Sequence, residues 1–77
     1  NRYEEALKFH LQAIELLTKY GNKVGVITSK INAANCYRKL GDATTSRNMY
    51  LELIPEIEKT WSGVISQYVN SSMKATN

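Results

Sequence analysis

A pair of small residues inside a helical pattern constrains the fold of this chain more than any other feature. Ala33 and Ala34 are followed by Tyr37, three residues after the second alanine. Helices that meet through alanine approach to about 8 Å, whereas large side chains hold them about 10 Å apart. Gly41 and Asp42 then combine a helix stop with a residue that can cap a following helix. The pattern predicts a helix that packs very closely against a neighbour.

A polar line runs along another face of the same expected helix. Four polar residues are separated by four, three and four positions, which places them on one side of a helix. They are Thr28, Asn32, Asn35 and Lys39. Asparagine is a poor helix former, and its amide both donates and accepts hydrogen bonds. This chemistry suits the backbone of an extended peptide. The alternative is that both asparagines bond only to the adjoining helix or to water.

Apolar residues recur at intervals of three and four along most of the chain, which predicts an all-α fold. The expected helices are residues about 2–20, 24–40, 43–60 and 63–75. Pro55 interrupts the third, because proline removes a backbone hydrogen bond and clashes with the preceding turn. Either that helix is kinked at Pro55 and continues, or it ends at Ile54 and a new helix starts. Trp61, beside Ser62 and Gly63, is expected to be a core residue that covers a turn, and the alternative is an exposed hot spot for binding.

The sequence also contains an internal repeat. Residues 25–32 align with residues 63–70, which follow them by 38 positions, and four of the eight residues are identical. The first and third expected helices correspond at an offset of 40, which places Pro55 opposite Glu15 inside a helix. This correspondence favours the kinked helix. Two kinds of helix therefore alternate along the chain, and residues 1–77 are expected to be one fragment excised from a longer array.

These segments resemble a known repeat. Residues 3–16 look like the second helix of a tetratricopeptide repeat, and residues 32–42 look like its first helix and turn. The spacing of about 40 residues is similar to the long-repeat subclass. The resemblance is strong up to residue 42 and weakens afterwards, where Ser46, Arg47 and Pro55 depart from the pattern. It implies an α-solenoid of antiparallel helical hairpins.

The resemblance also implies a function. In this family the first helix of each repeat lines a concave groove, and an Asn-x-x-Asn pair grips a peptide. Asn32 and Asn35 match that pair, whereas in the second unit Asn70 matches and Met73 does not. The peptide-binding residues expected on this basis are Thr28, Asn32, Asn35, Lys39, Ser66 and Asn70. The chain is therefore expected to act as a non-catalytic adaptor or scaffold for a protein or peptide partner.

Other chemistry finds little support in the sequence. His10 is the only histidine and Cys36 the only cysteine, and both fit core positions on their helices. Without further ligands at metal-binding spacing, no catalytic site, metal or cofactor is expected. A single cysteine excludes an internal disulfide and agrees with a cytoplasmic location. No apolar run approaches the roughly 18 residues of a membrane span.

Three alternatives remain open from the sequence. A two-repeat array lies below the usual stability threshold of about three repeats, so the chain could form a homodimer through exposed terminal helices. Residues 3–7 also resemble an endosomal-sorting three-helix module, although that module would need three helices and we count four. Nucleic-acid binding is the weakest alternative, because the ten lysines and arginines behind the net charge of +3 are dispersed.

Overall fold

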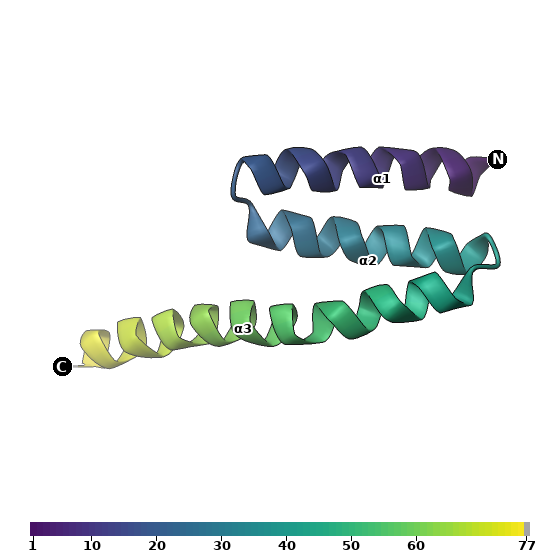
Figure 1. Ribbon diagram of the computed structural model, residues 1–77. Coiled ribbons are helices and arrows are strands. Elements are labelled where there is room, and N and C mark those ends of the chain that lie inside the picture. Colours follow the sequence, from purple (N-terminus) through teal and green to yellow (C-terminus); the bar gives the residue numbers. More distant parts are fainter. Residues whose placement is uncertain (77) are drawn as a thin grey trace.

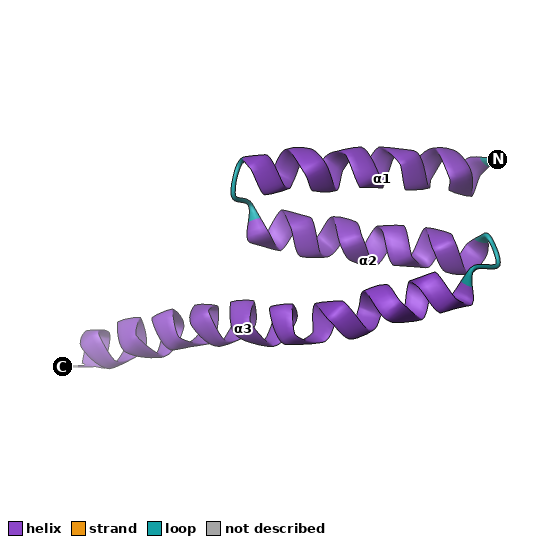
Figure 2. Ribbon diagram, viewed as in Figure 1, coloured by secondary structure: helices purple, strands orange, loops and turns teal. Residues whose placement is uncertain are grey.

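The chain folds into three helices joined by tight turns. The computed structural model describes the backbone of residues 1–76 and the side chains of residues 1–63, 65 and 66. The helices are α1 (Arg2–Lys19), α2 (Lys23–Lys39) and α3 (Ala43–Thr76), and each runs antiparallel to the one before it (Figure 1). The described part of the chain contains no strand (Figure 2). The prediction of an all-α fold built from antiparallel hairpins is confirmed.

The structure has three helices within residues 1–76, which is close to the expected number of about four. Residues that we assigned to a third and a fourth helix form the single helix α3, which is 34 residues long and runs through Pro55. A turn near Gly63 would need a change of backbone direction, but positive φ angles occur among the described residues only at Gly21 and Gly41. Of the two solutions for the proline, the structure has the continuing helix. The backbone therefore absorbs one lost hydrogen bond rather than ending the helix.

Gly63→Ala tests this continuity. In the interior of a helix alanine is favoured over glycine by about 1 kcal/mol, and a Cβ at Gly63 would meet no atom within 4 Å. The substitution should therefore raise the helix content measured by circular dichroism. The matched control is Gly41→Ala, which should destabilise the fold by about 1 kcal/mol or more because Gly41 has a φ of 93°. A loss of helix in Gly63→Ala would mean that the chain turns at residue 63.

The ends of the helices follow from capping residues. Gly21 and Gly41 take positive φ angles at the two turns. Asn22 caps α2 by accepting a hydrogen bond from a backbone N–H of the first turn. Asp42 caps α3 by accepting the Thr45 hydroxyl at 2.6 Å and the Thr45 backbone N–H at 3.1 Å. These two hydrogen bonds lower the pKa of Asp42 below its usual value, and the bond from the Thr45 hydroxyl has the larger effect. The predicted stop and cap after α2 are confirmed.

The core lies where α2 packs between its two neighbours. Helix α2 contacts both α1 and α3, whereas no contact joins α1 to α3 within residues 1–76. Ala33 and Ala34 are fully buried on α2, and Leu53 of α3 is only 1% exposed. Both alanines therefore lie at packed positions, as the sequence predicted. The three helices therefore form a row with α2 in the middle, rather than a bundle around one shared core.

The outer helices leave apolar side chains uncovered. On α1, Phe9 and Tyr20 are 68% and 75% exposed, and Leu16 lies between them along the same side of the helix. On α3, Leu51, Ile54, Trp61 and Ile65 are also exposed. Trp61 is 59% exposed in the middle of α3, so its expected place in a core was wrong. No described helix has the length and apolarity required to cross a membrane.

Candidate functional site

The polar line on α2 lies on the open side of the helix. Thr28, Asn32 and Lys39 are exposed, and Asn35 is half-buried. Ala33 and Ala34, which lie between Asn32 and Asn35 in the sequence, are completely buried. With 3.6 residues per turn, the polar line faces away from the alanines that contact the neighbouring helices. We call the surface formed by Thr28, Asn32, Asn35 and Lys39 the α2 polar face.

Asn35 differs from the rest of the α2 polar face because it is bonded to α3. Its side-chain oxygen accepts a hydrogen bond of 2.5 Å from the Tyr50 hydroxyl. The alternative reading, in which the asparagine bonds to the adjoining helix, therefore applies to the oxygen of Asn35. Its amide NH₂ is the group that remains to donate to a ligand. Asn35 thus joins α2 to α3 as well as forming part of the polar face.

Tyr50→Phe measures what this hydrogen bond contributes. A typical hydrogen bond stabilises a fold by about 0.5–1.5 kcal/mol net, and here removing the hydroxyl also leaves the half-buried Asn35 oxygen without its partner. We therefore expect Tyr50→Phe to lower the free energy of unfolding, measured with urea, by about 0.5–1.5 kcal/mol or more. Tyr20→Phe is the control, since Tyr20 is 75% exposed and should change stability by little. Equal stability of both variants would show that the Asn35 contact is not maintained in solution.

The other members of the α2 polar face remain accessible. The Thr28 hydroxyl donates to the Val24 carbonyl at 3.0 Å, which leaves its oxygen free to accept. The Asn32 side chain makes no hydrogen bond to any of the described residues. Lys39 is exposed in the last turn of α2. These three residues can therefore present an acceptor, an amide and a positive charge to the same ligand.

The second half of the predicted site is not brought beside the first. Ser66 is exposed on α3. The C-terminal part of α3 extends beyond α1 and α2 (Figure 1). The Asn70 side chain lies outside the described residues. We expected both on a separate inner helix, parallel to α2, but α3 has no turn at residues 60–63 that would create that helix. The structure thus groups only the four residues of the α2 polar face.

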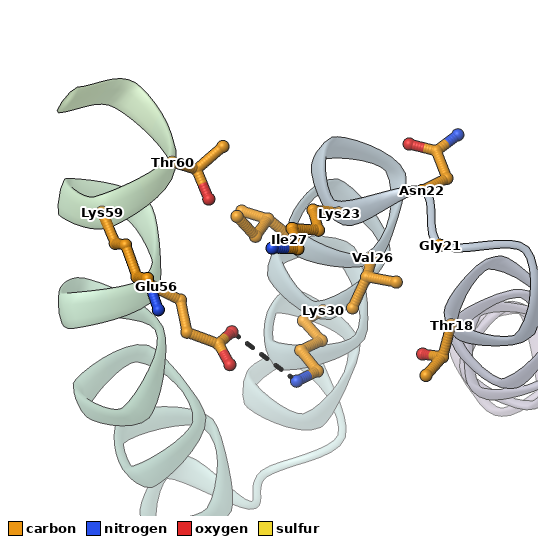
Figure 3. A pocket seen from close by; sticks show the side chains of 10 residues that line it. All are labelled: Thr18, Gly21, Asn22, Lys23, Val26, Ile27, Lys30, Glu56, Lys59 and Thr60. Atoms are coloured by element: carbon orange, nitrogen blue, oxygen red, sulfur yellow. Dashed lines mark ion pairs between the residues drawn. The ribbon is translucent and has the colours of Figure 1, made fainter. Parts of the chain in front are cut away.

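A notch on the other side of α2 was missed by the sequence reasoning. It encloses about 400 Å³ between the end of α1, the first half of α2 and the middle of α3 (Figure 3). Its lining residues are Thr18, Gly21, Asn22, Lys23, Val26, Ile27, Lys30, Glu56, Lys59 and Thr60. Lys30 and Glu56 reach toward each other and form an ion pair at 3.8 Å. Lys59 reaches this site only through the packing of α3, so a scan along the sequence had no signal for it.

The remaining chemistry-bearing residues do not assemble into a site in the described region. Within it no group of three histidine, cysteine or acidic side chains could hold a metal ion. His10 is half-buried on α1, with its ring edge-on to Phe9 at 6.0 Å between centroids. Cys36 is a buried free thiol on α2. Both positions agree with packing roles.

The order of the helices and the small buried residues of α2 agree with a known family of helical repeats. The family model of the tetratricopeptide repeat matches residues 1–55. The chain belongs to the tetratricopeptide repeat family. In tetratricopeptide repeat terms, α1 and α3 are second helices and α2 is a first helix. The match ends at Pro55, so it does not cover the rest of α3. Searches of curated proteins and of solved structures each returned no significant match.

Membership in the tetratricopeptide repeat family narrows the alternatives. Tetratricopeptide repeats generally serve as protein–protein interaction modules and are typically non-catalytic. The three-helix endosomal-sorting alternative was set aside on a count of four helices, whereas the described residues form three. It is disfavoured now on different grounds, since α1 and α3 share no contact in the described residues and the matching family is another. Assignment to the long-repeat subclass stays a prediction.

Proposed function

We propose that this chain is a non-catalytic module that binds a partner peptide or helix through the α2 polar face. The observation that carries the proposal is the division of α2 into two sides. Its alanines are fully buried, whereas Thr28, Asn32 and Lys39 are exposed on the opposite side. A helix needs only its packed side to hold the array together, so the polar residues of the other side are available to a ligand. A cytoplasmic location is part of this proposal.

The chemistry of the face suits an extended segment. Asn32 can donate to a peptide carbonyl and accept from a peptide N–H, whatever side chains the peptide carries. The Asn35 amide offers donors about one turn further along the helix, while its oxygen stays on Tyr50. Lys39 adds a positive charge at the C-terminal end of α2. The face therefore recognises the backbone amides of a peptide that lies along α2. It favours a peptide with an acidic group near Lys39.

Asn32→Ala tests the proposal directly. Peptides would be selected against the chain by phage display, and the tightest one titrated calorimetrically against the parent and the variant. Removing one amide should weaken binding by about 1 kcal/mol, or roughly fivefold, without loss of helicity. Asn48→Ala is the matched control, because Asn48 is an exposed asparagine on α3. Equal affinity of all three proteins would remove Asn32 from the binding site.

A specific observation also favours self-association as a second function. Phe9, Leu16 and Tyr20 are exposed along α1, and Leu51, Ile54 and Trp61 are exposed along α3. Contiguous exposed apolar side chains mark interaction surfaces in soluble proteins. A homodimer through these outer helices would cover them. Sedimentation equilibrium decides the matter: a monomer that stays cooperatively folded at every concentration excludes the dimer.

A further inference from the structure

We infer that the notch between α1, α2 and α3 is a second binding site, which takes an acidic peptide segment with an apolar side chain next to its carboxylate. This site lies on the opposite side of α2 from the α2 polar face. It is therefore independent of the function proposed above. The inference starts from the volume, the charge and the floor of the notch.

The notch has the dimensions of a ligand site. Its volume of about 400 Å³ falls within the range of roughly 300–1,000 Å³ that is usual for ligand pockets. It exists because the three helices meet unevenly at this end: α1 stops at Lys19, whereas α3 continues past the start of α2. Figure 3 shows the lining side chains of α1 on one side and of α3 on the other, with α2 between these two helices. A short peptide segment can enter between them.

The charge of the notch is unbalanced. Lys23, Lys30 and Lys59 line it, and Glu56 is the one acidic residue among its lining residues. Glu56 is paired with Lys30 at 3.8 Å, which leaves Lys23 and Lys59 as positive charges without a carboxylate in the notch. The site also lies at the start of α2, where the helix dipole adds positive potential. Its ligand is therefore expected to carry negative charge.

The floor of the notch selects among negatively charged ligands. Val26 and Ile27 are half-buried, and they present apolar surface between the lysines (Figure 3). A phosphate group would leave this surface in water, whereas a leucine-like side chain would cover it. An acidic residue beside an apolar one satisfies both the lysines and the floor. This combination favours a peptide over a nucleic acid or a free anion.

The experiment is an NMR titration of the isotopically labelled chain. The probe is a blocked tetrapeptide of alternating glutamate and leucine. We expect saturable shifts of the Val26 and Ile27 amides, and little change at Asn32. The double variant Lys23→Ala/Lys59→Ala should bind about fivefold to tenfold more weakly, which is the size expected for two exposed ion pairs. Lys8→Ala is the control, because Lys8 is an exposed lysine on α1 that belongs neither to the notch nor to the α2 polar face, and this variant should bind as the parent does.

A second probe keeps the inference falsifiable if the double variant is destabilised. The same tetrapeptide with glutamine in place of glutamate should bind the parent protein about fivefold to tenfold more weakly, with no change to the protein. Non-saturable shifts, or shifts centred on Asn32, would overturn the inference. So would inorganic phosphate or a short oligouridine that gives the same Val26 and Ile27 shifts at lower concentration than the peptide.

Discussion

Leu53→Ala should destabilise the chain by about 2–5 kcal/mol, which is the largest effect expected of any single substitution here. Leu53 is 1% exposed and is the largest fully buried side chain of the described core. Its removal costs the transfer free energy of the leucine side chain and leaves a cavity between α2 and α3. For a domain of this size, the midpoint of thermal unfolding should fall by about 10 °C or more.

Leu51→Ala is the matched control for this prediction. Leu51 lies on the same helix two residues earlier, but it is 55% exposed. Exposed substitutions usually change stability by less than about 0.5 kcal/mol. Circular dichroism followed through thermal and urea unfolding measures both variants. If the two leucine variants lost stability equally, the packed side of α3 would not be the side that carries Leu53.

Ala34→Leu should destabilise the fold by about 1–3 kcal/mol through the opposite mechanism, overpacking. Ala34 has no exposed surface, so the three added carbon atoms have no space unless the helices move apart. Separating α2 from its neighbour would also weaken the hydrogen bond between Tyr50 and Asn35. The unfolding midpoint in urea should shift to lower concentration, and the near-ultraviolet signal of the tyrosines should change.

The control for overpacking is Ala43→Leu. Ala43 is exposed in the first turn of α3, where a leucine side chain has space in water. We expect a change below about 0.5 kcal/mol, since surface substitutions rarely exceed this value. Unchanged stability of Ala34→Leu would show that α2 does not approach its neighbours as closely as its alanines require.

Local signals in the sequence were sufficient to predict most of the fold. Ala33 and Ala34 predicted the close contact because two adjacent small side chains allow a neighbouring helix to approach closely. Gly41 and Asp42 predicted a turn because a positive φ and a capping carboxylate act within a few residues. The boundaries of α1 and α2 therefore agree with the expected ranges to within one or two residues.

The continuity of α3 could not be predicted in the same way. Residues 63–70 repeat the start of α2, which indicated a new helix, but the repeat constrains helix type and does not require a turn before it. Gly63 has neither a positive φ nor a following cap residue, and the helix continues through it. The exposure of Trp61 follows, because a residue expected to cover a turn has no turn to cover.

The two candidate sites also differ in how far the sequence could predict them. The α2 polar face was predictable because its four residues share one helix and one spacing. The bond between Asn35 and Tyr50 was not, because it joins residues 15 positions apart through packing. The notch depends even more on packing, since Lys23 and Lys59 come together only when α3 lies against α2.

Solvent accessibility along α2 tests the central claim most directly. An inert, soluble paramagnetic agent would be added to the labelled chain, and its relaxation effect on side-chain NMR signals measured residue by residue. We predict strong broadening of the Asn32 amide and near-complete protection of the Ala33 and Ala34 methyl groups, since the alanines have no exposed surface and Asn32 is exposed. Equal broadening of the two alanines and Asn32 would contradict the division of α2 into a packed side and an open side.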